Sequence, residues 1–354
     1  MKILSVVGAR PQFVKLAPIS ATFAAAADVE HVVVHTGQHY DPMLSDVFFR
    51  DLGIPDPDVH LGVGSASHGK QTGTILAAMD DVLEEHRPDW VLVYGDTNST
   101  LAGALSAVKL GIPLAHLEAG LRSFNRAMPE EHNRVLTDHA ADLCLAPSAT
   151  AVAHLRTEGL EDRTVLVGDV MTDVLFHVAE TVGERQPAAL DSLGLAPGEY
   201  YVSTVHRAEN TDDPERLAGI LDALRGLDRP AVLLTHPRLA AKVAEHGLSL
   251  DGGALRPVEP LAYPDLVAAV RASAGVATDS GGLQKEAFLL RVPCTTLRTE
   301  TEWTETVDLG WNVLATEPAK VAAAVTRPAP SATDATPYGD GRAATHVLEA
   351  LRAR

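Results

Sequence analysis

Short apolar runs alternate with helix-like segments along the whole chain, and this alternation limits the possible folds more than any other feature. The strand-like runs of the first half are 3–7, 32–34, 91–94, 112–115, 143–146 and 165–168. The pattern then starts again with the runs 201–205, 231–234, 255–258 and 275–278. Strands that are separated by helices run parallel, and such sheets need helices on both faces. The sequence therefore predicts an α/β fold with two parallel sheets.

Two stretches without regular patterning divide the chain. Residues 183–199 contain Gly and Pro breaks that are typical of a connection between domains, and residues 327–338 hold three prolines that indicate a linker. At 354 residues, the chain is also longer than one ordinary domain. We therefore expect a first domain over residues 1–172, a second over 173–338, and a last helix at about 339–354.

The chain is strongly acidic, with 47 Asp and Glu residues against 29 Lys and Arg residues and a net charge of −18. This balance argues against sequence-independent binding of nucleic acid and against anchoring on an anionic membrane. The apolar amino terminus is interrupted by Arg10 before a signal-peptide core forms, and no run is long enough to span a membrane. Cys144 and Cys294 lie in apolar runs, as buried free thiols do in a reducing compartment. We therefore expect a cytoplasmic protein.

Residues 91–134 carry a dense set of ionisable groups next to strand ends. Asp96 and Glu118 each follow the carboxyl end of an apolar run, which is where open α/β sheets bind their ligands. Glu130 and Arg134 are four residues apart on a predicted helix and so share one face. Carboxylates and cations that converge at one sheet edge favour proton-transfer chemistry.

These residues also have purely structural interpretations. Asp96 could be the N-cap of the following helix, and Glu130 with Arg134 could be a surface ion pair worth about a few tenths of a kcal/mol. Glu118 is harder to explain in this way, because it ends an apolar run just before Ala-Gly. Sequence alone leaves both interpretations of Asp96, Glu130 and Arg134 open.

Gly281 and Gly282 lie between a strand and a helix in the second half of the chain. Glycines let an anion approach a helix N-terminus, whose free N–H groups and dipole favour negative charge. The alternative is a tight turn capped by Ser280.

Cations follow strands in both halves of the chain. Arg10 and Lys15 follow the first strand, although Lys15 could instead lie on an exposed helix face. His206 and Arg207 follow a strand of the second half, so His206 is either an acid–base group or phosphate ligand, or a buried core imidazole. In an acidic protein, such cations indicate a site for an anionic ligand.

Metal and dinucleotide sites are not indicated. His39, His116 and His236 lack metal-site spacings such as H-E-x-x-H. The first strand–helix turn, residues 8–12, lacks the G-x-G-x-x-G pattern of dinucleotide sites.

The motifs together resemble those of the non-hydrolysing UDP-N-acetylglucosamine 2-epimerase family. The matching segments are GARPQFVK at 8–15, GDT at 95–97, HLEAGLR at 116–122, PEEHNR at 129–134, HRAEN at 206–210 and DSGGLQKE at 279–286. The resemblance extends from residue 1 to about residue 316 in the family's order. It implies a glycosyltransferase-B-like fold, in which two Rossmann-like domains enclose a cleft and the last helix packs back onto the first domain. It also implies a homodimer.

The resemblance further implies a reaction. The family inverts C2 of the sugar in UDP-N-acetylglucosamine, giving UDP-N-acetylmannosamine, through elimination of UDP to 2-acetamidoglucal and re-addition. No metal, nicotinamide or other cofactor is implied, because there is no net redox change. The alternatives are a 2-epimerase of UDP-2,3-diacetamido-2,3-dideoxy-glucuronate, a glycosyltransferase of the same architecture, and a non-catalytic sensor of nucleotide sugars.

Site residues are implied by their motif positions. Asp96, Glu118 and Glu130 match the family's essential carboxylates, and His206 matches a group near the diphosphate or the reacting centre. The implied substrate-binding residues are Arg10, Lys15, Arg134, Arg207, Ser280, Gly281, Gly282 and Glu286. Among these, residues 280–282 would hold the diphosphate and Glu286 would accept the ribose hydroxyls.

Some positions depart from the common pattern. Gln12 stands where many members have Glu, and together with residues 36–40 and 300–303 it is similar to the branch that includes the diacetamido-glucuronate epimerases. Thr299 stands where that branch commonly has Asp. Gln38, Gln71 and His236 lie in the regions where some bacterial members bind a second UDP-N-acetylglucosamine as activator. The loop 62–74 differs there, so activation is not predicted.

Overall fold

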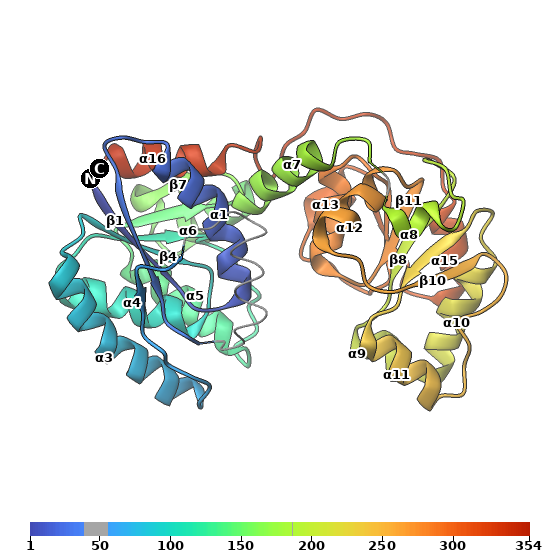
Figure 1. Ribbon diagram of the computed structural model, residues 1–354, viewed down its shortest axis with the longest axis horizontal. Coiled ribbons are helices and arrows are strands. Elements are labelled where there is room, and N and C mark those ends of the chain that lie inside the picture. Colours follow the sequence, from blue (N-terminus) through green and yellow to red (C-terminus); the bar gives the residue numbers. More distant parts are fainter. Residues whose placement is uncertain (39–55, 186) are drawn as a thin grey trace. The chain divides into compact units, whose positions relative to one another are not determined.

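The computed structural model describes residues 1–38, 56–185 and 187–354, excepting the side chain of Arg10. The described chain forms two units, Met1–Val174 with Thr336–Arg354 and Leu175–Ala335. The division falls inside helix α7 (Val170–Val182). Each unit is built on one parallel sheet with helices against it (Figure 1). The predicted α/β class with two parallel sheets is therefore confirmed. His39, one of the histidines considered as metal ligands, lies outside the described residues.

The sheet of the first unit places the two strands that precede Asp96 and Glu118 side by side. Its order is β3-β2-β1-β4-β5-β6-β7, and all described neighbours are parallel. The strands are β1 (Lys2–Val7), β2 (Glu30–His35), β3 (Val59–His60), β4 (Trp90–Tyr94), β5 (Leu114–Leu117), β6 (Leu143–Ala146) and β7 (Thr164–Leu166). Because β4 and β5 are parallel neighbours, with Tyr94 opposite Leu117, the residues that follow them emerge at the same sheet edge.

Successive apolar side chains of each strand point to opposite faces of this sheet. Both faces are therefore apolar, and helices cover both. On β1, Ile3 and Val7 pack into a core with α1 and α16, while Leu4 and Val6 pack into a core with α3, α4 and α6. The helices of the first unit are α1 (Arg10–Ala24), α3 (His68–His86), α4 (Asn98–Lys109), α5 (Pro129–Ala140), α6 (Ala149–Thr157) and α16 (Ala343–Arg352), with a 3-10 turn at Glu161–Arg163.

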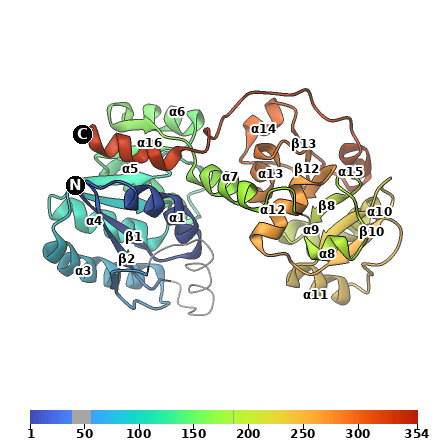
Figure 2. The ribbon, with the colours of Figure 1, turned by 45° about the horizontal axis from the view of Figure 1, so that its top comes forward.

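The last helix of the chain, α16, belongs to the first unit and lies beside α1 (Figure 2). Its buried residues alternate at helical spacing and include Val347 and Leu351. Asp173 on α7 accepts the backbone N–H groups of Ala343 and Ala344, at 3.0 and 2.8 Å. These are N–H groups of the first turn of α16, which have no partner within their own helix, so Asp173 fixes the start of this helix.

The second unit has a six-stranded parallel sheet of order β10-β9-β8-β11-β12-β13. Its strands are β8 (Tyr201–Thr204), β9 (Ala231–Leu234), β10 (Leu255–Val258), β11 (Gly275–Thr278), β12 (Cys294–Thr296) and β13 (Asn312–Leu314). Its helices after α7 are α8 (Ala188–Asp191), α9 (Ala208–Thr211), α10 (Pro214–Arg225), α11 (Pro237–Glu245), α12 (Tyr263–Arg271), α13 (Gly281–Leu289), α14 (Thr304–Asp308) and α15 (Pro318–Val325). The neighbours β8 and β11 precede the two motifs of this unit, so both motifs leave one sheet edge.

The structure also describes the two cysteines and the helices that were considered as possible membrane spans. Cys144 and Cys294 are buried free thiols, and burial raises the pKa of each to about 12. Within the three described ranges, no helix combines the length and the apolar character needed to cross a bilayer.

Candidate active site

Unusual backbone conformations mark both strand ends of the first unit. Gly95, directly after β4, has φ +60°, and Glu118, directly after β5, has φ +73°. A positive φ is uncommon for a residue with a side chain and costs of order 1–3 kcal/mol, so it persists only where the surroundings enforce it. The turn after β5 therefore holds Glu118 in a conformation that this residue would rarely adopt alone, whereas Gly95 adopts its positive φ at little cost.

Lys15 on α1 forms an ion pair with Glu118. Only 11% of the Lys15 side chain is exposed, so the alternative of an exposed helix face is wrong. Burial lowers the pKa of Lys15, but the negative charges of Glu118, Asp96 and Asp169 outweigh it and raise the pKa above 10.5. Lys15 is therefore a fixed positive charge beside two of the carboxylates.

Arg134 on α5 forms an ion pair with Asp96. The same guanidinium contacts Glu131 at 3.1 Å. Arg134 therefore pairs with Asp96 and with Glu131, the residue next to Glu130. Glu130 itself is partly exposed in the first turn of α5, where the sequence predicts it. The interpretation of Asp96 as a helix N-cap is wrong, because Thr97 is the N-cap of α4.

Several buried polar residues that the sequence analysis did not select support these groups. Glu131, 2% exposed, accepts the N–H and hydroxyl of Ser123 and the N–H of Phe124, each at 2.9 Å. Burial raises the pKa of Glu131, but these bonds and Arg134 outweigh it, so the pKa falls below 4.5. Glu131 lies next to Glu130 in an acidic pair, which could have drawn attention to it. No local feature of the sequence, however, shows which of the two carboxylates is buried.

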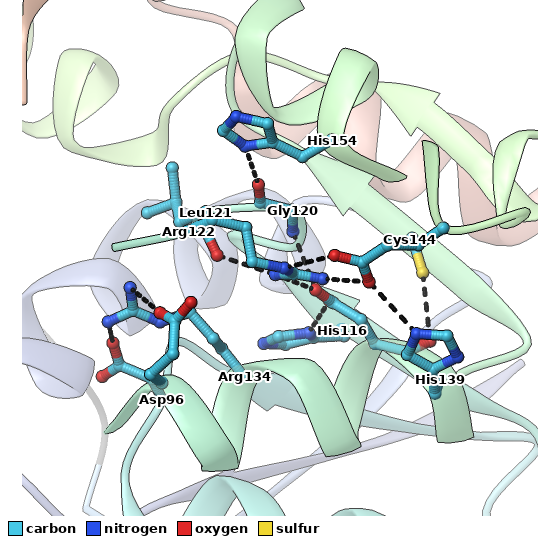
Figure 3. A network of polar contacts seen from close by, with 12 residues as sticks. Asp96, His116, Gly120, Leu121, Arg122, Arg134, His139, Cys144 and His154 are labelled. Atoms are coloured by element: carbon cyan, nitrogen blue, oxygen red, sulfur yellow. Dashed lines mark hydrogen bonds and ion pairs between the residues drawn. The ribbon is translucent and has the colours of Figure 1, made fainter. Parts of the chain in front are cut away.

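A second set of supporting polar residues includes His116 at the end of β5 and Arg122 in the loop that follows it (Figure 3). His116 contacts the carboxylate of Asp138 and the carbonyl oxygen of Gly95, and Arg122 contacts Asp138 and Glu158. His116 and Arg122 belong to the HLEAGLR motif, so the sequence contained a signal for them. Asp138 is remote from that motif and only the tertiary structure identifies it.

Asp279 organises the site of the second unit. This fully buried carboxylate follows β11 and accepts the backbone N–H groups of His206 and Arg207, both at 2.9 Å. It also accepts the amide of Asn210, at 3.0 Å, and lies 3.1 Å from His206 Nδ1. Burial raises the pKa of Asp279, but the bonds from His206 and Asn210 and the backbone outweigh it and lower the pKa.

The geometry of His206 follows from this contact. Its side chain is 35% exposed, so the interpretation as a buried core imidazole is wrong. Because ionised Asp279 can only accept a hydrogen bond, His206 Nδ1 must be the donor in this contact. His206 Nε2 then remains available to a ligand. Arg207 donates Nε–H to the carbonyl oxygen of Asp279, at 3.0 Å, which fixes its guanidinium beside the start of α13.

The start of α13 is open. Ser280 is the N-cap residue, but its side chain makes no capping bond, so the helix N–H groups are not satisfied in that way. Gly282 is exposed, and an added Cβ there would meet no atom within 4 Å. An added Cβ at Gly281 would lie 3.7 Å from Glu302 Oε2 and 3.8 Å from Arg207 Nη2. Free N–H groups with a guanidinium alongside are suited to bind a phosphate.

Glu286 lies further along α13 and accepts the hydroxyl of Tyr263, at 3.0 Å. Burial raises the pKa of Glu286, while the Tyr263 bond and Lys285 act in the opposite direction. Outside residues 39–55 and 186, the structure contains no group of three or more His, Cys, Asp or Glu residues arranged to hold a metal ion. The side chain of Arg10 is outside the described residues, so its predicted role stays a prediction.

The structure therefore forms one cluster in each unit. The first unit joins Lys15 to Glu118 and Arg134 to Asp96 at one sheet edge. The second unit places His206 and Arg207 next to Ser280, Gly281 and Gly282 through Asp279.

Comparison with known proteins agrees with these motifs. The family profile described as UDP-N-acetylglucosamine 2-epimerase matches residues 21–352. A UDP-N-acetylglucosamine 2-epimerase homolog of Methanococcus maripaludis is 43% identical over 359 residues, covering 99% of both chains. The UDP-2,3-diacetamido-2,3-dideoxy-D-glucuronate 2-epimerase of Pseudomonas aeruginosa is also 43% identical, over 361 residues and 99% of both chains.

Solved structures show the same architecture. The UDP-GlcNAc 2-epimerase of Methanocaldococcus jannaschii superimposes with a TM-score of 0.89 at 35% identity, covering 100% of both chains. Its complex with UDP-GlcNAc and UDP gives a TM-score of 0.80 over the same coverage. The fold is therefore glycosyltransferase-B-like, with two Rossmann-like units.

Proposed function

Because this chain belongs to the UDP-N-acetylglucosamine 2-epimerase family, we propose that it interconverts UDP-N-acetylglucosamine and UDP-N-acetylmannosamine. The observation that carries the proposal is the pair of ion-paired carboxylates, Glu118 with Lys15 and Asp96 with Arg134, at the ends of neighbouring strands. The ion pairs hold each carboxylate in one position, and a group that takes or gives a proton in the transition state must be positioned in this way.

The difficulty of the reaction is that the C2 proton of the sugar is not acidic, since no carbonyl adjoins it in the ring. Elimination avoids this difficulty. The C2–H bond breaks and its proton passes to a carboxylate, the electron pair forms the C1=C2 double bond of 2-acetamidoglucal, and the C1–O bond breaks to release UDP. Re-addition of UDP, with a proton delivered to the opposite face of C2, gives the epimer. Asp96, Glu118 and Glu130 are the proposed acid–base set for these two proton transfers.

The departing diphosphate needs positive charge, because negative charge develops on its bridging oxygen. We assign this role in the second unit to Arg207, His206 and the N–H groups of residues 280–282. The open start of α13 and the fixed guanidinium of Arg207 support the assignment. Arg10 is proposed to contribute a further cation, and Glu286 to accept the ribose hydroxyls. The first unit with the last helix thus supplies the carboxylates, and the second unit binds UDP.

A second candidate substrate is UDP-2,3-diacetamido-2,3-dideoxy-glucuronate. The identity of 43% to the Pseudomonas aeruginosa enzyme that is named for this sugar favours it. The same elimination applies to both sugars, because they share the 2-acetamido group and the UDP leaving group. The two candidates therefore differ in substrate and not in mechanism.

The assembly and the location are also proposals. The family resemblance supports a homodimer, and the two buried free thiols support a cytoplasmic location. Light scattering during size-exclusion chromatography should give twice the chain mass of 37.5 kDa. A mass of one chain at working concentration would contradict the dimer.

Proton NMR in D₂O tests the reaction and the substrate together. With UDP-N-acetylglucosamine, the manno anomeric signal should grow and carry deuterium at C2. Deuterium in the gluco form alone would show elimination with protonation on one face only. Turnover of the diacetamido uronate but not of UDP-N-acetylglucosamine would select the second candidate, and a glycosylated acceptor without C2 exchange would contradict both.

Conservative variants test the carboxylates. Asp96→Asn and Glu118→Gln should each lower kcat by about 100- to 10,000-fold, because each removes a proton acceptor at nearly constant shape. UDP affinity, measured by calorimetry, should stay close to that of the wild type. The matched control is Glu84→Gln, an exposed carboxylate on α3 of the same unit, which should retain wild-type kcat. A wild-type rate in either site variant would remove that residue from the acid–base set.

A further inference from the structure

His116 on β5 is fully buried, and both of its ring nitrogens face acceptors. Nδ1 lies 2.6 Å from Asp138 Oδ1, and Nε2 lies 2.7 Å from the carbonyl oxygen of Gly95. Both distances are those of hydrogen bonds. A neutral imidazole has one donor and one acceptor nitrogen, so it cannot donate to both partners.

The protonation state of His116 follows from the two partners. A carbonyl oxygen can only accept, so Nε2 carries a proton. Asp138 also forms an ion pair with Arg122 Nη1 at 2.7 Å and accepts the N–H of Gly120 at 3.1 Å, as an ionised carboxylate does. Nδ1 therefore also carries a proton.

Charge alternates along this network, in which only Glu158, with a side chain 25% exposed, is not fully buried (Figure 3). The order is His116, Asp138, Arg122 and Glu158, where Arg122 holds Glu158 through two bonds of 2.7 Å. With a protonated His116 the four groups are electrically balanced. Buried polar groups are tolerated when each is hydrogen-bonded, whereas a neutral His116 would leave a lone pair against an acceptor.

The network joins the three segments that carry the candidate carboxylates. Through Gly95 it holds the turn that leads to Asp96. Through Gly120 it holds the turn that follows Glu118. Asp138 lies on α5, the helix that also carries Glu130 and Arg134. One buried ion pair thus fixes the relative positions of the two turns and the helix.

We propose that His116 is a positioning residue, held as an imidazolium between Asp138 and Gly95, that sets the relative placement of Asp96, Glu118 and helix α5. The protonation state of His116 is independent of the proposed function. The effect of His116 on turnover rests on the proposed function. His116 does not touch the substrate in this proposal. It acts through the Gly95 carbonyl and through Asp138.

NMR of the wild-type protein labelled with [¹⁵N]histidine tests the protonation state at neutral pH. His116 should show two protonated ring nitrogens, with ring N–H protons shifted downfield and protected from exchange. Nuclear Overhauser contacts to the backbone around Gly95 and Gly120 assign the signals without a variant. A single unprotonated ring nitrogen would overturn the imidazolium, whether or not the protein turns over either sugar.

Kinetics of His116→Gln test the positioning role. Glutamine can donate to one of the two acceptors but brings no charge to Asp138. We expect kcat to fall by up to about 100-fold, because a misplacement of about 1 Å can cost that much in rate, while KM stays nearly constant. The second variant His139→Gln is the control, because His139 contacts the far end of the network at Glu158 and is 47% exposed. It should keep wild-type kcat.

The outcomes separate the two claims. Wild-type kcat in His116→Gln would overturn the positioning role. If His116→Gln does not fold, Asp138→Asn replaces it, since this change removes the charge that holds the imidazolium and should lower kcat with the same constant KM. A KM that rises as much as kcat falls would show that His116 acts on substrate binding, and would also overturn the positioning role. A wild-type enzyme inactive on both sugars contradicts the proposed function, but leaves the NMR result decisive for His116.

Discussion

At the scale of single residues, the candidate site depends on backbone conformations that the chain adopts only in its tertiary setting. Glu118 has φ +73° and Gly95 has φ +60° on the adjacent strand end. A Cβ at Gly95 would lie 3.1 Å from Glu118 Oε2 and 3.3 Å from Lys15 Nζ. Gly95 is therefore required both by its conformation and by the space that the Lys15–Glu118 ion pair occupies.

Gly95→Ala tests this argument. The Glu118 carboxylate must shift by a few tenths of an ångström to admit the added methyl group, so kcat should fall, but by less than the roughly 100-fold that a misplacement of about 1 Å can cost. The positive φ should also cost about 1–2 kcal/mol of stability. Steady-state kinetics and denaturant unfolding measure the two effects.

Gly111→Ala is the matched control for Gly95→Ala. Gly111 has φ +71° in the same unit, but no atom lies within 4 Å of an added Cβ. The control should lose a similar amount of stability and retain wild-type kcat. Equal kcat in the two variants would show that the crowding at Gly95 does not matter for turnover.

At the scale of elements, α5 begins where the sequence predicts it, and Glu131 determines how it is attached. Pro129 opens the helix and Glu130 and Glu131 lie in its first turn. Glu131 bonds the loop at Ser123 and Phe124 and contacts Arg134, so it fastens the loop after Glu118 to the helix. The neighbouring Glu130 remains partly exposed and available for chemistry.

Glu131→Gln should lower stability at about pH 7 by roughly 1.5–3 kcal/mol, the usual contribution of hydrogen bonds to a charged group. Because the folded pKa of Glu131 is below 4.5, its contribution is fully present above pH 4.5 and is lost as pH falls through the folded pKa. The difference between wild type and variant should therefore shrink in acid. Urea unfolding at several pH values measures it.

Glu130→Gln provides the comparison for Glu131→Gln, because it removes a charge from the same helical turn. It should leave stability nearly unchanged, within about 0.5 kcal/mol, as is usual for exposed positions. A pH-independent loss of stability in Glu131→Gln would contradict the ionised state assigned to Glu131.

At the scale of the whole molecule, the chain leaves the first unit within α7 and returns to it after residue 335. The returning helix α16 buries Val347 and Leu351 against the first unit, and Asp173 caps its start. The first unit is therefore complete only when the last residues of the chain are in place.

Leu351→Ala should destabilise the first unit by about 2–5 kcal/mol, because Leu351 is 1% exposed in its core. Native-state hydrogen exchange should show faster opening in Met1–Val174, with protection in Leu175–Ala335 unchanged. Leu166→Ala, at a position that is 55% exposed in the same unit, should change stability by less than about 0.5 kcal/mol. Equal loosening of both units would contradict this division.

The sequence by itself determined the α/β class, the strand ends that carry Asp96 and Glu118, and the start of α5. These features depend on local periodicity and on which residues begin helices, and both are visible within about ten residues of chain. The motifs likewise identified Lys15, His206 and residues 280–282 as candidates, because they follow strands. Arg134 was identified because it shares a predicted helix face with Glu130.

Only the tertiary structure decided which of these side chains meet. Lys15 and Glu118 are 103 residues apart, and Arg134 and Asp96 are 38 residues apart. Their contacts depend on the sheet order that places β1, β4 and β5 next to one another, and no local pattern contains this order. For the same reason Glu131 could not be distinguished from Glu130, nor Asp138 and Asp279 recognised as anchors. A buried carboxylate is defined by donors that reach it from distant segments.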